Sequence, residues 1–302
     1  MALSEGAGSL DRLATEARRA DADYDSRSTS ELVELMNEED ASVPAAVAAV
    51  AAELATAIDA IVARLRAGGR LVYVGAGSSG RIAELDAEEC EGTFSTAPGQ
   101  VVALVAGNGL PSAEREAAED DSAAGRRAVE ALAVSAADAV IGVSASGRTP
   151  FVLAALEAAA EAEALTIALT AVEESELARG ADHELAVVVG PEFVAGSTRL
   201  KAGTAQKLVL NTISTVAMIR LGKTYGDLMV DVRSSNEKLA ARARRVVRLA
   251  AGVTDDEAER ALAEANGSAK VAVVALLAGV DAETARNRLE QASGHVRAAL
   301  EQ

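Results

Sequence analysis

Two short loops in this sequence combine glycine, hydroxyl and basic side chains where an apolar run gives way to a helix-like segment. They are Gly75-Ala76-Gly77-Ser78-Ser79-Gly80-Arg81 and Ser144-Ala145-Ser146-Gly147-Arg148-Thr149-Pro150. Unpaired N–H groups and the helix dipole at a helix start favour an anion, and hydroxyl and guanidinium groups add hydrogen bonds to it. The pair of loops therefore predicts a phosphate site. The predicted ligand-binding residues are Gly77, Ser78, Ser79, Ser144, Ser146, Arg148 and Thr149.

The glycines of the first loop, at positions 75, 77 and 80, also match a dinucleotide-binding pattern. A nicotinamide site needs in addition an acidic residue about 20 positions further on, which holds the ribose hydroxyls. No Asp or Glu occurs between Glu91 and Glu114, so the sequence disfavours a dinucleotide. The other alternative is that the serines only cap helices, as serines commonly do.

A carboxylate near the first loop is a candidate for proton transfer. Ile82, Leu85 and Glu89 fall at helical spacing on one face, so Glu89 is predicted to lie on an apolar stripe where partial burial favours acid–base chemistry. The alternative is that Glu89 is an ordinary surface residue without a catalytic role, since the chain has 46 acidic residues. A second predicted helix, 112–132, carries a cluster of five acids between residues 114 and 121; periodicity does not choose among them, and a solvated face is the default there. These acids are Glu114, Glu116, Glu119, Asp120 and Asp121.

The elements that position these residues follow from alternating patterns between residues 71 and 190. Short runs rich in Val, Ile and Leu alternate with longer helical stretches, which is typical of a parallel sheet covered on both faces. The sequence therefore predicts an α/β fold, a doubly wound parallel-sheet sandwich. The predicted strands are 71–74, 101–105, 139–143, 165–169 and 185–189, with helices from about Ile82, over 112–132 and over 151–164.

Helical patterns flank this region on both sides. Two helices are predicted within 31–66, a buried helix over 197–222, and three short helices after Asn236. Their starts are marked by a Thr254–Glu257 capping box, by Gly267-Ser268 and by Gly279 before Asp281. The predicted domains are an N-terminal helical arm (1–60), the α/β domain (61–232) and a C-terminal helical domain (233–302).

Composition narrows the classes of function. Acidic residues outnumber basic ones by 46 to 29, and a formal charge of −17 disfavours nucleic acid and anionic membranes as partners. One cysteine, Cys90, and two distant histidines, His183 and His295, predict neither a disulfide nor a metal site. Cys90 is interpreted as a small packed residue. The start of the chain has no export signal, so we expect a cytoplasmic protein.

Taken together, the motifs resemble a known family. The two serine loops resemble those of sugar isomerase (SIS) domains, which bind phosphosugars, and the chain from about Thr15 onward resembles the N-acetylmuramic acid 6-phosphate etherases. The resembling stretches are 75–81, 86–94, 144–150, 196–203, 204–215 and 228–231.

The resemblance implies an SIS-type, flavodoxin-like fold, a ubiquitin-associated-like C-terminal bundle and a homodimer with sites near the subunit interface. It implies cleavage of the D-lactyl ether of N-acetylmuramic acid 6-phosphate, giving N-acetylglucosamine 6-phosphate and D-lactate in cell-wall sugar recycling, without metal or redox cofactor. Glu89 matches the acid–base glutamate of the family. Glu119 matches its second active-site glutamate on resemblance alone.

The chain departs from the family pattern at two places. Arg19 and Ala20 stand where the family usually has Asn-Pro, and Gly92 replaces a proline before Thr93. Neither change removes a charged group from the predicted site. Two other functions remain open at this point, an aldose–ketose phosphosugar isomerase and a non-catalytic phosphosugar sensor. A DNA-binding sensor would need a basic segment, which the acidic N-terminal helices do not provide.

Overall fold

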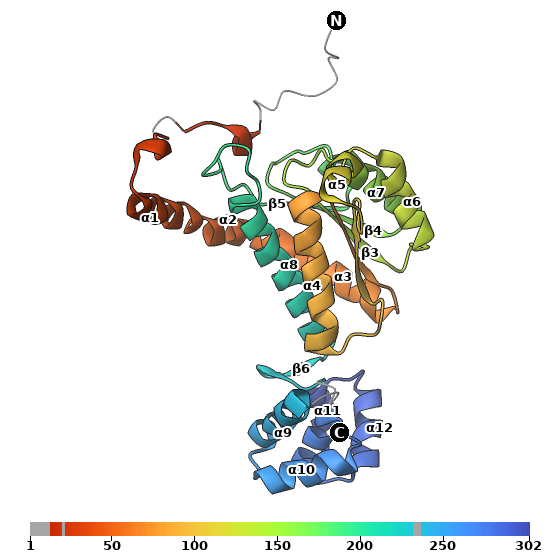
Figure 1. Cartoon of the computed structure of the whole chain (residues 1–302). Coiled ribbons are helices and arrows are strands. Elements are labelled where there is room, and N and C mark those ends of the chain that lie inside the picture. Colours follow the sequence, from red (N-terminus) through yellow and green to blue (C-terminus); the bar gives the residue numbers. More distant parts are fainter. Residues whose placement is uncertain (1–12, 20–21, 232–236) are drawn as a thin grey trace, which may run out of the picture. The chain divides into compact units, whose positions relative to one another are not determined.

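The computed structural model describes residues 13–19, 22–231 and 237–302 (Figure 1). By compactness, the described chain divides into two units. The first contains residues up to Ala87 together with Gly99–Ile213, and the second contains Glu88–Pro98 together with residues from Ser214 onward. The division into three domains at residues 60 and 232 stays a prediction, and residue 233 lies outside the described residues.

A parallel five-stranded sheet organises the first unit, in the order β2-β1-β3-β4-β5. This order is the flavodoxin-like, doubly wound arrangement, so the predicted fold class is confirmed. The order reverses between β1 and β3, and ligands of such sheets bind outside the carboxyl ends of the strands at that point. The strands are β1 (Leu71–Gly75), β2 (Val101–Val105), β3 (Ala139–Val143), β4 (Leu165–Thr170) and β5 (His183–Ala186).

Helices cover both faces of the sheet (Figure 1). Val72 and Val74 of β1 pack with Phe151 in one apolar cluster, on the side of α6 (Ser122–Ala131) and α7 (Pro150–Glu161). The other face meets α3 (Ala51–Arg66), α4 (Gly77–Phe94) and α8 (Lys201–Arg220). On that face the buried Tyr73 hydroxyl donates to Asp86 of α4 at 3.0 Å, and Lys207 of α8 reaches the same carboxylate at 3.3 Å. These bonds fix α4, and with it the first serine loop, against the sheet.

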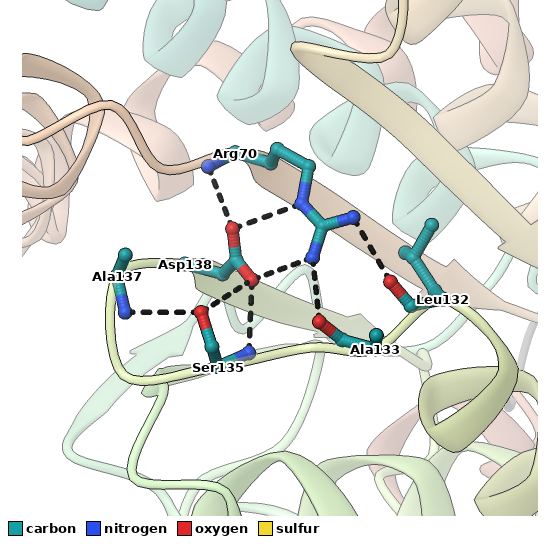
Figure 2. A network of polar contacts seen from close by, with 6 residues as sticks. All are labelled: Arg70, Leu132, Ala133, Ser135, Ala137 and Asp138. Carbon is teal, nitrogen blue, oxygen red and sulfur yellow. Dashed lines mark hydrogen bonds and ion pairs between the residues drawn. The ribbon is translucent and has the colours of Figure 1, made fainter.

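The opposite end of the sheet is held by an ion pair between the buried Asp138 and the half-buried Arg70 (Figure 2). The Arg70 side chain donates to both oxygens of Asp138, at 3.0 and 2.8 Å, and to the carbonyls of Leu132 and Ala133. The Ser135 amide donates to the same carboxylate. Burial disfavours the charged form of Asp138, but the hydrogen bonds from Arg70 and Ser135 outweigh it and lower its pKa. This network joins the starts of β1 and β3. It therefore holds together the two strands whose other ends carry the serine loops.

The helical stretch predicted over 112–132 is interrupted. It forms α5 (Ser112–Ala118) and then α6, because the Asp121 carboxylate accepts the Ala124 amide at 2.8 Å and caps a new helix. Glu119 lies in the break. Its carbonyl accepts the Phe151 amide of α7 at 3.1 Å, which ties the break to the second serine loop.

Three further predicted boundaries need correction. The stretch 31–66 forms three helices rather than two, α1 (Thr29–Asp40), α2 (Val43–Ala49) and α3, because Pro44 starts a helix of its own. Helix α4 begins at Gly77, five residues earlier than predicted. Strand β5 runs over 183–186, not 185–189, because its ladder to β4 closes with the bond from the Val187 amide to the Thr170 carbonyl.

The second unit is helical apart from a two-stranded hairpin, β6 (Thr224–Tyr225) with β7 (Leu228–Met229), which was not predicted from the sequence. The capping box at Thr254 and the caps at Ser268 and Asp281 are confirmed. Two helices outside those signals were also missed, so the described bundle has five instead of three. They are α9 (Glu237–Ala251), α10 (Asp255–Glu264), α11 (Ala269–Ala278), α12 (Ala282–Gln291) and α13 (Val296–Leu300).

No single helix in the described chain has the length and hydropathy needed to cross a membrane. Two pairs of helices, bent by 60° and 110° at short breaks, reach those values only when each pair is taken together.

Candidate active site

A cavity of about 490 Å³ opens at the carboxyl ends of β1, β2 and β3 in the first unit. This is the edge at which the sheet order reverses and at which the two serine loops were predicted to meet. Six of the seven predicted ligand-binding residues line the cavity. They are Gly77, Ser78, Ser79, Ser144, Ser146 and Thr149.

The first serine loop turns directly from β1 into α4. Gly75 and Gly80 pack backbone against backbone, since a methyl group on Gly75 would lie 2.7 Å from the Gly80 Cα. Gly77 has a φ of +52°, a conformation that side chains disfavour. The half-buried Ser78 and Ser79 follow in the first turn of α4, where backbone N–H groups have no acceptor within the helix. The loop thus presents two hydroxyls and a helix start to the cavity, as an anion requires.

Hydroxyl groups in the second loop form their own network. Ser144 is only 3% exposed, and its hydroxyl accepts the Gly147 amide at 3.1 Å and bonds the Thr149 hydroxyl at 2.9 Å. The Ser146 hydroxyl accepts the Arg148 amide at 3.3 Å. Ser144 therefore shapes the loop, while Ser146 and Thr149 present the more accessible hydroxyls. Arg148 is half-buried and is not one of the residues that line the cavity.

Glu119, at the break between α5 and α6, brings a carboxyl group into the cavity. A methyl group on Gly77 would lie 2.6 Å from its Oε1, so this carboxylate rests against the start of α4. Burial raises the pKa of Glu119, and the negative charges of Asp120 and Glu116 raise it further, while Arg81 acts in the opposite direction. A carboxyl group with a raised pKa is suited to proton transfer near neutral pH.

Several charged residues of the cavity were not predicted as site residues. Arg81, Arg115, Glu16, Glu84 and Glu116 all line it. Arg81 belongs to the first serine loop, so its position in the motif was a usable signal. Glu16 had none, because it comes from an N-terminal segment far away in sequence.

That N-terminal segment reaches the cavity through a backbone contact. The Gly196 amide donates to the Thr15 carbonyl at 2.9 Å, and Leu13 and Glu16 line the cavity beside Thr198. Two residues of this arm, Arg19 and Ala20, depart from the family pattern. Arg19 forms an ion pair with Glu39. Ala20 lies outside the described residues.

The apolar stripe predicted to carry Glu89 is wrong. Helix α4 buries the face of Ala83, Ala87 and Cys90, whereas Leu85 is 47% exposed and Glu89 is exposed. A buried polar residue, Asp86, takes part in that packing, and this rotates the buried face away from the one chosen by hydropathy. Glu89 is not among the residues lining the cavity, and it lies about 140° around the helix from Glu84, which does line it. Its catalytic role stays a prediction.

The remaining reactive side chains lie elsewhere. Cys90 is 2% exposed, in agreement with its interpretation as a packed residue. His183 begins β5, and His295 precedes α13. Within the described ranges, no cluster of three or more His, Cys, Asp or Glu side chains has the arrangement of a metal site.

Two domain families match parts of the chain. Residues 53–160 match the N-terminal SIS domain of glucokinase regulatory protein, and residues 122–215 match the SIS domain. These matches cover the sheet, both serine loops and Glu119.

Curated relatives match nearly the whole chain. An N-acetylmuramic acid 6-phosphate etherase of Streptomyces coelicolor is 55% identical over 96% of this chain and 94% of its own length. One from Rubrobacter xylanophilus is 57% identical over 88% of this chain and 89% of its own. Among solved structures, a phosphoheptose isomerase from Francisella tularensis has a TM-score of 0.53 at 22% identity, covering 64% of this chain and all of that one, which supports the fold alone.

Proposed function

The chain belongs to the N-acetylmuramic acid 6-phosphate etherase family, and from this premise we propose that the cavity beside Glu119 is its active site. The enzyme is a carbon–oxygen lyase that removes the D-lactyl ether of N-acetylmuramic acid 6-phosphate and forms N-acetylglucosamine 6-phosphate. The observation that carries the site assignment is the Glu119 carboxyl group, with its raised pKa, resting against the glycine turn that presents Ser78 and Ser79.

The reaction needs two proton transfers. In the open-chain aldehyde, a base removes the proton on C2, the electron pair forms the C2–C3 double bond, and the C3–O bond breaks. The departing lactate oxygen takes a proton from an acid. Water then adds at C3 while a proton returns to C2. We assign these transfers to the pair Glu119 and Glu89, each alternating between acid and base.

We propose that the phosphate is held at the far end of the sugar by the two serine loops. Ser78 and Ser79 offer hydroxyls at the start of α4, and Ser146 and Thr149 offer them from the second loop. With Gly77 these groups form an anion site at the starts of two helices, where backbone N–H groups and the helix dipole favour the phosphate. Binding energy from this non-reacting group can orient C2 and C3 toward the carboxyl groups. Arg148 remains a proposed second-loop contact.

A homodimer is part of the proposal. Glu89 is exposed on α4 together with Leu85, one turn away on the same face, and we propose that this face meets a second copy of the chain. In a symmetric dimer the same face of both copies meets its partner, which can bring Glu89 of one subunit to the cavity of the other. A cytoplasmic location also belongs to the proposal, supported by the single, reduced cysteine.

The decisive assay uses N-acetylmuramic acid 6-phosphate in heavy-oxygen water, with mass analysis of both products. Elimination and water addition place the heavy oxygen on the sugar and leave the lactate unlabelled. An isomerase or a sensor would release no lactate, and hydrolysis at the lactyl carbon would label the lactate instead; either result would contradict the mechanism. The Glu119→Gln protein, purified in parallel, controls for contaminating activity.

A further inference from the structure

Arg81 is a cationic side chain of the cavity to which neither the fold nor the proposed mechanism yet gives a task. It is the fifth residue of α4, lines the cavity and is exposed. One of its guanidinium nitrogens donates to the Ser78 hydroxyl at 3.3 Å, and none of the ion pairs found among the described residues includes it. Its planar, five-donor head is therefore available to a ligand.

Helix geometry places Arg81 close to the proposed proton-transfer group. Gly77 and Arg81 are four residues apart on α4, so they stand on one face, about 5–6 Å from each other. Glu119 Oε1 rests against Gly77, and a guanidinium nitrogen of Arg81 bonds the Ser78 hydroxyl, so both charged groups lie at the first turn of α4. The influence of the Arg81 charge on Glu119 is consistent with this placement.

The substrate carries two anionic groups at different distances from the reaction. The phosphate is on C6, whereas the lactyl carboxylate is attached through the ether oxygen to C3, the carbon at which the bond breaks. A group that transfers a proton at C2 or at the ether oxygen must stand next to the lactyl group. A cation at the same helix turn as that proton-transfer group is thus placed for the lactyl carboxylate.

We propose that Arg81 binds the carboxylate of the D-lactyl group and so determines the preference of this site for the ether substrate over sugar phosphates that lack it. The inference rests on the proposed function of the cavity. The pairing answers an electrostatic need, because four carboxylates, Glu16, Glu84, Glu116 and Glu119, line the cavity and repel another anion. Arg and carboxylate groups pair through two parallel hydrogen bonds, which also fixes the orientation of the leaving group.

The test compares two ligands that differ only in the lactyl group. The 1,5-anhydro forms of N-acetylmuramic acid 6-phosphate and N-acetylglucosamine 6-phosphate cannot open to an aldehyde, so both bind without reacting. Their affinities are measured by calorimetry on the full-length protein and on Arg81→Gln. We expect a loss of about 10- to 100-fold for the lactyl ligand, the size of one charge-assisted pair, and less than about twofold for the other.

Arg115→Gln is the matched control, because it removes the same charge from the same cavity but from α5. It should leave the ratio of the two affinities unchanged. Arg81→Lys, which keeps the charge without the fork, should give an intermediate ratio and covers the case in which the glutamine variant fails to fold.

Equal losses for both ligands would assign Arg81 to the phosphate and overturn the inference. Unchanged affinities for both ligands would also overturn it. If the wild-type protein binds neither ligand, it is the proposed function of the cavity that fails.

Discussion

The carboxyl group of Glu119 lies directly against the backbone of Gly77. A methyl group on Gly77 would stand 2.6 Å from Glu119 Oε1, well inside the contact distance of nonbonded atoms. The same glycine has a φ of +52°, which L-residues adopt at a cost of roughly 1–2 kcal/mol. One residue without a side chain therefore serves both the turn that presents the serines and the group proposed to move protons.

Replacing this glycine should separate activity from folding. Gly77→Ala is expected to lower kcat about 100-fold, because a displacement of about 1 Å at a reacting group costs that much. The matched control is Gly99→Ala, whose φ of +76° gives similar backbone strain but whose added methyl meets nothing within 4 Å. Steady-state lactate release and thermal melts of both variants check the prediction. Equal kcat values in the two variants would mean that the Glu119 position does not matter.

The ionised Glu119 carboxylate should also lower the stability of the folded protein. Because its folded-state pKa is raised, ionisation is harder in the folded protein than in the unfolded chain, and stability is lost as pH rises through the folded-state value. Glu119→Gln is therefore expected to melt about 1–3 °C above the wild type at pH 7. The gain should vanish below about pH 4, where the carboxyl is protonated in both states. A gain that persists in acid would assign the effect to something other than this ionisation.

The sequence predicted the three central strands of the sheet well because they are buried along their whole length. Residues 139–143 are recovered without error, since a strand covered on both faces must be continuously apolar. The half-buried edge strand 101–105 is also recovered, because all five of its residues are apolar. The edge strand β5 was misplaced because it begins with the polar residues His183 and Glu184, which lie outside the apolar run 185–189 used to predict it. The break before α2 was not predicted, because the alanine-rich periodicity runs through Pro44, near which α2 begins.

Within the site, local motifs could be predicted and long-range contacts could not. The serine loops are contiguous in sequence, and their chemistry follows from a strand end and a helix start. Glu119 reaches the cavity because Asp121 caps a new helix, which hydropathy does not encode. The buried face of α4 was predicted wrongly for a related reason. The buried Asp86 pairs with Tyr73 and Lys207, and these long-range contacts change which face of the helix is covered.

The ion pair at the other end of the sheet should act on stability alone. Asp138→Ala leaves the partly exposed Arg70 without its carboxylate partner and the Ser135 amide without its acceptor, which should cost about 1–3 kcal/mol, or roughly 2–12 °C in Tm. The lowered pKa of Asp138 means that its contribution is present at neutral pH and is lost as pH falls through the folded-state value. The loss of Tm in Asp138→Ala should therefore shrink in acid. At neutral pH this variant melts below the wild type, whereas Glu119→Gln melts above it.

Two measurements separate this role from a general surface effect. Glu161→Ala, which removes one partner of the exposed Arg126–Glu161 pair, should change Tm little. Substrate KM should stay close to the wild-type value in both variants. A raised KM in Asp138→Ala would mean that the network shapes the cavity directly.

Glu89 should be essential for turnover although it is exposed. Glu89→Gln is expected to fold normally and to lose about 100-fold or more in lactate release, the usual worth of a general acid–base group. Its neighbour Glu88 is also exposed on α4, so Glu88→Gln is the matched control and should retain activity. Near wild-type turnover in Glu89→Gln would refute the catalytic role.

Mixed dimers can show which subunit provides each carboxylate. Chains carrying Glu89→Gln and chains carrying Glu119→Gln are co-expressed with different affinity tags, and the mixed dimers are isolated. If Glu89 serves the partner's cavity, each mixed dimer has one site with both glutamates, and activity returns to about half of the wild type per dimer. If both carboxylates came from one chain, every site in the mixed dimer would lack one of them and activity would stay at the level of the single variants. Sedimentation at assay concentration, which should give a mass of two chains, completes the test because a monomer would exclude any shared site.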